Sequence, residues 1–143
     1  MNINNKNFIR NLVVKSTTEN LSLVRKFTKD AALYCGFDED TASKIVLAVD
    51  EACTNIIKHA YKYSPQGEIF ISINFVSPKF TVTITDKGNH FNPELVPVPN
   101  IKEYYKLKKV GGLGIFLMKK LMDEVSYSSI ENTNKVVLTK YLS

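Results

Sequence analysis

The sequence predicts a two-layer α+β sandwich, a single domain over residues 1–143 in which a mixed or antiparallel sheet carries helices on one face. Two neighbouring segments alternate apolar and polar residues as the strands of a hairpin do, and other segments repeat apolar residues at helical spacing. The predicted order is strand, helix, helix, two strands, a long irregular stretch, a helix and two strands. A chain of 143 residues is long enough to bury a core of its own.

The first part of the chain predicts one strand and two helices. Residues 8–14 are expected to form the strand, and the helix after it is expected to end at Gly36, because glycine is common at helix C-termini. Asp38 is suited to cap the next helix, expected over residues 39–62 and ending before Pro65. The first helix is marked by the apolar residues Leu21, Val24, Phe27, Ala31 and Tyr34.

The middle of the chain predicts a β-hairpin followed by an irregular segment. Apolar residues alternate over residues 68–75 and again over 80–85, where threonines occupy the other face. Residues 92–111 show no periodicity and contain three prolines. An irregular stretch of this length in a small domain is typical of a functional loop, so we expect a lid over a binding site.

The last part of the chain predicts a helix over about 112–122 and two strands, about 124–130 and 135–142, joined at residues 132–134. We find no internal repeat, linker or low-complexity segment. These elements complete the sheet and place one more helix against it.

Composition narrows the classes of function. The net charge of +5 suits an anionic nucleotide or an acidic protein partner, and no nucleic-acid recognition motif accompanies it, so no direct nucleic-acid contact is expected. Two cysteines, Cys35 and Cys53, form no disulfide framework, which fits a reduced, cytoplasmic setting. The N-terminus lacks the apolar region of a signal peptide, and no apolar run is long enough for a membrane span.

Glu51 and Asn55 lie one helical turn apart on the predicted second helix, on the side away from its apolar face. An asparagine oxygen is a neutral ligand suited to Mg²⁺, and a glutamate can orient or deprotonate a nucleophile. The alternative is an ordinary solvated face on which Glu51 pairs with Lys44 or Lys58. The spacing alone does not separate the two interpretations.

The segment from Asp86 to Phe91 follows the threonine-rich strand. The carboxylate of Asp86 can accept a hydrogen bond from an exocyclic amine such as N6 of adenine. Gly88 has no Cβ, so a flat ring can lie close to its backbone, and Phe91 can wall an apolar pocket. The alternative is a simple turn between strand and loop, in which Asp and Gly are common.

Three glycines, Gly111, Gly112 and Gly114, precede the last predicted helix. Glycines let backbone N–H groups approach a phosphate, and a helix N-terminus adds partial positive charge. A glycine turn that serves packing is the alternative. The spacing matches neither a P-loop nor a dinucleotide-binding fingerprint.

Taken together, these motifs resemble the Bergerat-fold (GHKL) ATPase superfamily, which includes gyrase, Hsp90, histidine kinases and MutL. The similarity is greatest to the bacterial anti-sigma factor serine-protein kinases and covers essentially the whole chain. It rests on DEACTNIIKHAY (50–61), the pattern D-x-G-x-x-F (86–91), GGLGIFLMKKLMDEV (111–125) and LTKYL (138–142).

The resemblance implies a histidine-kinase-like ATPase domain that uses ATP and Mg²⁺, with a lid over residues 92–111. It implies that Glu51 is the general base that takes a proton from a serine or threonine of a partner. It implies that Asn55 binds Mg²⁺. The nucleotide-binding residues it implies are Asn55, Asp86, Gly88, Phe91, Lys109, Gly111, Gly112, Gly114 and Thr139. Of these, Thr139 would help to hold the adenine ring.

The implied function is that of an anti-sigma factor and ATP-dependent serine/threonine protein kinase. Such a protein sequesters a sigma factor, phosphorylates an anti-anti-sigma antagonist of the STAS fold and acts as a homodimer. The chain departs from its relatives in having no arginine in the lid, where Lys108 and Lys109 are the nearby substitutes.

Three alternatives follow from the sequence. A nucleotide-binding anti-sigma or switch module with little or no kinase activity is the first, and the lid without arginine favours it. A histidine-kinase ATPase domain is disfavoured, because no dimerising helical hairpin with a phospho-acceptor histidine is found. A basic nucleic-acid-binding protein would show strong, salt-dependent affinity for DNA.

Overall fold

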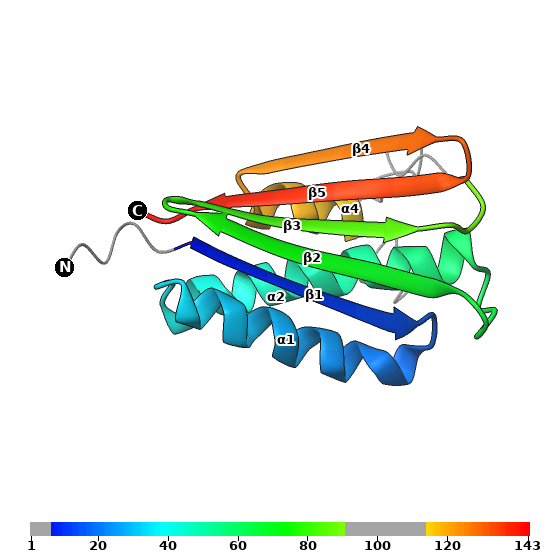
Figure 1. Cartoon of the computed structure of the whole chain (residues 1–143), viewed down its shortest axis with the longest axis horizontal. Coiled ribbons are helices and arrows are strands. Elements are labelled where there is room, and N and C mark those ends of the chain that lie inside the picture. The colour runs from blue at the N-terminus through cyan, green and yellow to red at the C-terminus, as the bar shows by residue number, and fades with distance from the viewer. Residues whose placement is uncertain (1–6, 91–113) are drawn as a thin grey trace, which may run out of the picture.

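The computed structural model describes residues 7–90 and 114–143, and within them the chain forms one five-stranded sheet with the strand order β1-β2-β3-β5-β4 (Figure 1). All neighbouring strands are antiparallel, which decides between the mixed and the antiparallel sheet expected from sequence. The strands are β1 (Asn7–Lys15), β2 (Glu68–Val76), β3 (Lys79–Asp86), β4 (Glu124–Ile130) and β5 (Thr133–Tyr141).

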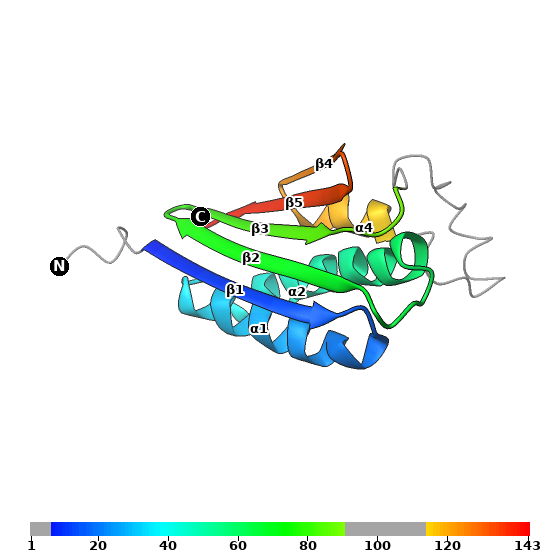
Figure 2. The same cartoon turned by 45° about the vertical axis from the view of Figure 1, so that its right-hand side comes forward.

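The helices cover one face of this sheet, as predicted (Figure 2). Within the described residues, α2 packs between α1 and α4 and lies against the central strands β3 and β5. The helical segments are η2 (Thr18–Asn20), α1 (Leu21–Tyr34), α2 (Glu39–Asn55), the turn of π-helix η3 (Ile56–Ala60) and α4 (Gly114–Leu121). The two-layer α+β fold is therefore confirmed.

The core lies between the helices and the sheet. Every second residue of the hairpin β2–β3 is buried there, because successive side chains of a strand point to opposite faces. From α2, a broad apolar stripe covers them. The largest fully buried side chains include Phe75, Phe80, Ile45, Ile57, Ile69, Ile71, Ile73 and Ile84.

The second helix starts as predicted and ends differently. Asp38 caps α2 by accepting a 2.7 Å hydrogen bond from the backbone N–H of Thr41, and Gly36 before it has a φ of +109°, where glycine is favoured. The predicted single helix over 39–62 instead changes to a π-helical turn directly after Asn55. The backbone N–H of Tyr61 reaches back to the carbonyl of Ile56 (3.0 Å). Such wide turns are frequent at functional sites.

The last hairpin is tighter than predicted. Glu131 adopts a φ of +57°, and β5 already begins at Thr133 rather than at residue 135. Asn134, expected in the connection, therefore lies within the strand and pairs in register with Asp86 of β3.

Candidate functional site

Asp86 and Asn134 form the base of the site. Asp86 is 2% exposed, and its Oδ1 accepts hydrogen bonds from Nδ2 of Asn134 (2.9 Å) and from the backbone N–H of Gly88 (2.9 Å). Its Oδ2 accepts no hydrogen bond from any residue between 7 and 90 or between 114 and 143. The carboxylate is thus held firmly by one oxygen and keeps the other for a ligand.

The surroundings of Asp86 have opposing effects on the pKa of its carboxyl group. Burial raises the pKa of its carboxyl group, and this is the largest effect. The hydrogen bonds from Asn134 and Gly88, and the charge of His90, act to lower it. A buried carboxylate with a free acceptor atom is suited to read a donor group such as an amine.

Asp86, Asn134 and Asn55 line one hollow between α2 and the sheet. Its walls include the apolar side chains of Ala52, Ile56 and Val136, and the side of β4 contributes Tyr127. Apolar walls with a few convergent polar groups are typical of sites that bind a small organic ligand.

Asn55 presents an unsatisfied oxygen at this hollow. The residue is 4% exposed, and Oδ1 is the one buried side-chain polar atom without a hydrogen-bond partner in the part of the chain that the structure describes. Leaving such an atom unpaired costs about 1–3 kcal/mol, so native structures rarely do so without a reason. A cation is a natural partner for an oxygen that no N–H or O–H approaches.

The donor set around Asn55 fits Mg²⁺ bound together with phosphates. No cluster of three or more His, Cys, Asp or Glu side chains that would hold a metal occurs among the described residues. Mg²⁺ keeps several waters and is usually held by one or two protein ligands plus substrate phosphates. The amide oxygen of Asn55 matches that role.

Glu51 lies one turn before Asn55 on α2 and is half-buried. Burial raises the pKa of its carboxyl group, the neighbouring charge of Asp50 adds to this, and Lys58 opposes it. Of the two ion pairs weighed from sequence, Lys44 pairs instead with Asp40 at 3.2 Å. In the described part of the chain, Glu51 forms no ion pair, which leaves its carboxylate available.

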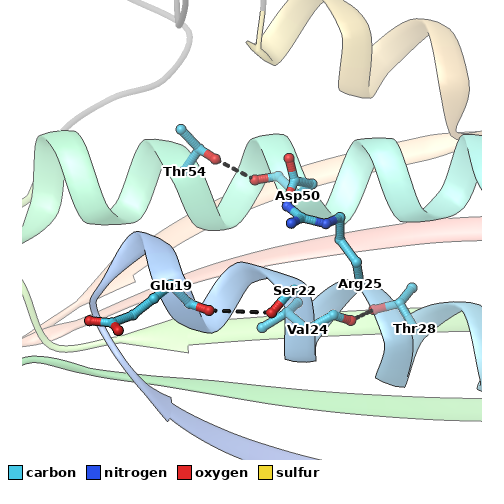
Figure 3. A network of polar contacts seen from close by, with 7 residues as sticks. All are labelled: Glu19, Ser22, Val24, Arg25, Thr28, Asp50 and Thr54. Carbon is cyan, nitrogen blue, oxygen red and sulfur yellow. Dashed lines mark hydrogen bonds and ion pairs between the residues drawn. The ribbon is translucent and has the colours of Figure 1, made fainter.

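Asp50, the adjacent acid, has a structural role (Figure 3). Its Oδ1 lies 2.7 Å from the guanidinium of Arg25 on α1, and its backbone carbonyl accepts a 2.8 Å hydrogen bond from Oγ1 of Thr54. Asp50 therefore ties α1 to α2, which agrees with the expectation that it shares no task with Glu51.

Gly88 is required by packing against the end of the helix. A Cβ at this position would lie 2.7 Å from both the carbonyl carbon and the oxygen of Ala60, and the next residue, Asn89, donates a 2.7 Å hydrogen bond to that oxygen. The space of the missing side chain is thus filled by Ala60 rather than by a flat ring. Gly88 still belongs to the site through its N–H, which holds Asp86.

Thr139 is not brought to the site. Thr139 pairs with Thr81 of β3 and lies five residues after Asn134 on β5. Because side chains alternate along a strand, this odd spacing turns the side chain of Thr139 to the opposite face of the sheet. Gly114 is the first residue of α4, close to the predicted start. The lid over 92–111 and the residues Phe91, Lys109, Gly111 and Gly112 lie outside the described residues.

Two residues of the site, Asn134 and His90, were not predicted. The alternation of Asn134 with the buried Val136 and Leu138 is the signal that places it on the core side of β5. His90 contacts Asn134, with Nδ1 2.5 Å from Oδ1 of the amide. Nothing in the sequence around His90 indicates this contact, because its partner is 44 residues away.

A hollow lined by Asp86, Asn134 and Asn55, beside the end of α2 on an antiparallel sheet, is the arrangement expected of a nucleotide-binding α+β domain. The family described as "Histidine kinase-like ATPase domain" matches residues 14–140. The chain therefore belongs to this family. No helix among the described residues is both long and apolar enough to cross a membrane.

Similar proteins carry a more specific name. Serine-protein kinase RsbW of Bacillus subtilis is 32% identical over 145 residues, covering 98% of this chain and 89% of that protein. Serine-protein kinase RsbW of Listeria innocua is 32% identical over 136 residues, covering 92% and 86% respectively.

A solved structure shares the fold. The RsbU and RsbW domains of a Mycobacterium tuberculosis protein superpose with a TM-score of 0.68 at 16% identity. The match covers 94% of this chain and 32% of that longer one.

Proposed function

We propose that this protein is an ATP-dependent serine/threonine protein kinase and anti-sigma factor. The observation that carries the proposal is the pair of uncommitted oxygens, Asp86 Oδ2 and Asn55 Oδ1, on residues that line the same hollow. One is suited to the base of a nucleotide and the other to the cation that accompanies its phosphates. Membership of the ATPase family and the names of its relatives support the same conclusion.

At the base end of the hollow, Asp86 accepts a hydrogen bond from the 6-amino group of adenine. Asn134 and the N–H of Gly88 occupy its other oxygen and hold the carboxylate in place. The walls from Ala52, Ile56 and Val136 exclude water from the ring. This arrangement favours adenine over a purine that carries an oxygen at the same position.

At the phosphate end, Asn55 contributes an amide oxygen to Mg²⁺, and Gly111, Gly112 and Gly114 remain predicted contacts of the phosphates. When bound, Mg²⁺–ATP supplies the γ-phosphoryl group for the transfer. Glu51 would orient the serine or threonine hydroxyl of the partner and take its proton, as that oxygen bonds to the γ-phosphorus and the bond from this phosphorus to ADP breaks. Positioning of this kind is most of what a protein contributes to phosphoryl transfer.

The raised pKa of Glu51 supports its role as the base. Burial raises the pKa of the carboxyl group, and a carboxylate with a raised pKa is a stronger proton acceptor. Because Glu51 forms no ion pair among the described residues, its carboxylate can accept a hydrogen bond from the hydroxyl of a substrate.

The partners are part of the proposal. We infer a sigma factor that is sequestered, a STAS-fold antagonist that is phosphorylated, a homodimeric state and a cytoplasmic location. The alternative is a nucleotide-binding anti-sigma or switch module with little kinase activity. It is favoured by one observation: the only arginines of the chain are Arg10 and Arg25, so none lies in the segment 92–111.

The proposal is tested by phosphate transfer from γ-labelled ATP to a purified STAS-domain antagonist. We expect Glu51→Gln to reduce transfer by about 10²–10⁴-fold, the usual contribution of a general base, with ATP binding retained. Asp40→Asn is the matched control, since it neutralises an exposed acid of the same helix and should leave transfer near the wild-type rate. Binding of ATP without transfer by the wild-type protein would support the switch module instead.

A further inference from the structure

His90 bridges two oxygen atoms at the edge of the site. Its Nδ1 lies 2.5 Å from Oδ1 of Asn134, and its Nε2 lies 2.6 Å from the backbone carbonyl of Glu131 in the β4–β5 turn. The imidazole ring thus links the segment after β3 to the start of β5, directly beside the amide that holds Asp86.

The orientation of the Asn134 amide follows from its neighbours. Its Nδ2 faces three acceptors: Oδ1 of Asp86 at 2.9 Å and the carbonyls of Gly88 at 3.1 Å and Asn89 at 3.3 Å. Only an N–H donor suits that position. Oδ1 must therefore point the other way, where it accepts a 2.8 Å hydrogen bond from the hydroxyl of Ser129 and faces His90.

Both ring nitrogens of His90 consequently face acceptors. A neutral imidazole carries one N–H and satisfies one of them, whereas the imidazolium carries two and satisfies both. The same contacts raise the pKa of His90, with the bond to Asn134 first, the bond to Glu131 second and the charge of Asp86 adding to them. Lys87 and His90 both line a second hollow beside the turn after β3, and Lys87 brings a positive charge to it.

We propose that His90, as the imidazolium, is a positioning residue for base recognition. It fixes the amide of Asn134 so that Asp86 keeps one oxygen for the purine amine. When His90 loses its proton, one of its two contacts is lost and the amide is held less firmly. This inference rests on the proposed function, because it assigns the role of His90 to the nucleotide site.

The sign of the pH dependence follows from the raised pKa. The contribution of His90 is fully present below its ordinary value of 6.5 and disappears as the pH rises through the higher value of the folded protein. Nucleotide affinity is therefore expected to fall across this window, by about three- to tenfold, the usual contribution of one hydrogen bond.

The experiment combines two measurements on the full chain. NMR titration of the imidazole protons gives the pKa of His90, with His59→Gln to assign the signals, since the chain has two histidines. Calorimetry gives the affinities for ADP and GDP from pH 6 to 9 in wild type, His90→Gln and His59→Gln. Thermal unfolding at each pH confirms that the variants are folded.

We expect His90 to titrate above 6.5, the ADP affinity of wild type and His59→Gln to fall as His90 deprotonates, and His90→Gln to show a flat profile with a smaller preference for ADP over GDP. ADP binding with the same pH slope in His90→Gln would overturn the role of His90 and leave the proposed function standing. Absence of ADP binding at every pH would overturn both.

Discussion

At the scale of single residues, the site contains two polar groups whose burial destabilises the folded protein. The half-buried carboxylate of Glu51 has its pKa raised above its ordinary 4.5 by desolvation. The amide oxygen of Asn55 is buried without a partner in the described residues. Residues that weaken the folded state in this way are typical of sites selected for function.

Glu51→Gln should therefore increase stability at neutral pH. Because the folded-state pKa of Glu51 is raised, its contribution to stability is fully present below 4.5 and is lost as the pH rises through the folded value. We expect the melting temperature of Glu51→Gln to exceed that of wild type at pH 7–8 and to approach it near pH 4. A lower melting temperature at pH 8 would contradict the environment described here for Glu51.

Asn55→Ala tests whether this residue binds Mg²⁺, and it should do so with little effect on stability. The substitution removes a buried oxygen that has no partner, and this gain offsets part of the lost packing, so we expect a loss of at most about 1 kcal/mol in the free energy of unfolding. Mg²⁺ should no longer strengthen ADP binding, as measured by calorimetry with and without the metal. Thr54→Val, which changes the neighbouring side chain, is the control, and Mg²⁺ should still strengthen its binding of ADP. If Mg²⁺ strengthens ADP binding equally in Asn55→Ala and in wild type, Asn55 is not the Mg²⁺ ligand.

At the scale of elements, the site depends on a close contact between the end of a helix and the turn after β3. Gly88 abuts Ala60, and the hydroxyl of Tyr61 accepts a 3.0 Å hydrogen bond from the N–H of Lys87 while donating to the carbonyl of Glu68 (2.7 Å). The element that carries Glu51 and Asn55 is thereby fixed relative to Asp86.

Gly88→Ala tests this contact. Its methyl group would lie 2.7 Å from the backbone of Ala60, so we expect a loss of about 1–3 kcal/mol in the free energy of unfolding. ADP binding should weaken as well, because the turn that orients Asp86 must move. Lys87→Ala, which truncates the exposed side chain next to it, should change stability by less than about 0.5 kcal/mol. Similar stability of the two variants would disprove the packing role of Gly88.

The same scale shows what the sequence could predict. Periodicity located the strands and helices, since burial on one face imposes a period of 2 or of about 3.6. It could not locate the π-helical turn after Asn55 or the early start of β5, because these depend on backbone geometry at Glu131 and on contacts distant in sequence. Thr139 was assigned by resemblance of the last strand, whereas the register puts Asn134 opposite Asp86.

At the scale of the whole molecule, the site joins three separate parts of the chain: α2, the end of β3 and the start of β5. A ligand that bridges them binds the folded state and has no equivalent site in the unfolded chain. Nucleotide binding must then stabilise the protein as a whole.

Ligand-linked unfolding measures this coupling. With Mg²⁺–ADP at 100 times its dissociation constant, we expect about 2.7 kcal/mol of added stability and a higher melting temperature. The shift should be smaller without Mg²⁺, and GDP at the same concentration should give less. No shift at millimolar ADP would mean that the hollow is not a nucleotide site.

The most direct measurement is calorimetric titration of wild type and Asp86→Asn with ADP and GDP in the presence of Mg²⁺. In the variant, the N–H groups of Asn134 and Gly88 require an oxygen at the Oδ1 position, so the amide turns its NH₂ group toward the base. The account predicts that wild type prefers ADP and that Asp86→Asn loses at least about tenfold in ADP affinity, with its preference shifted toward GDP. Equal ADP affinity in both proteins would contradict the assignment of Asp86 as the residue that reads adenine, and with it the proposed nucleotide site.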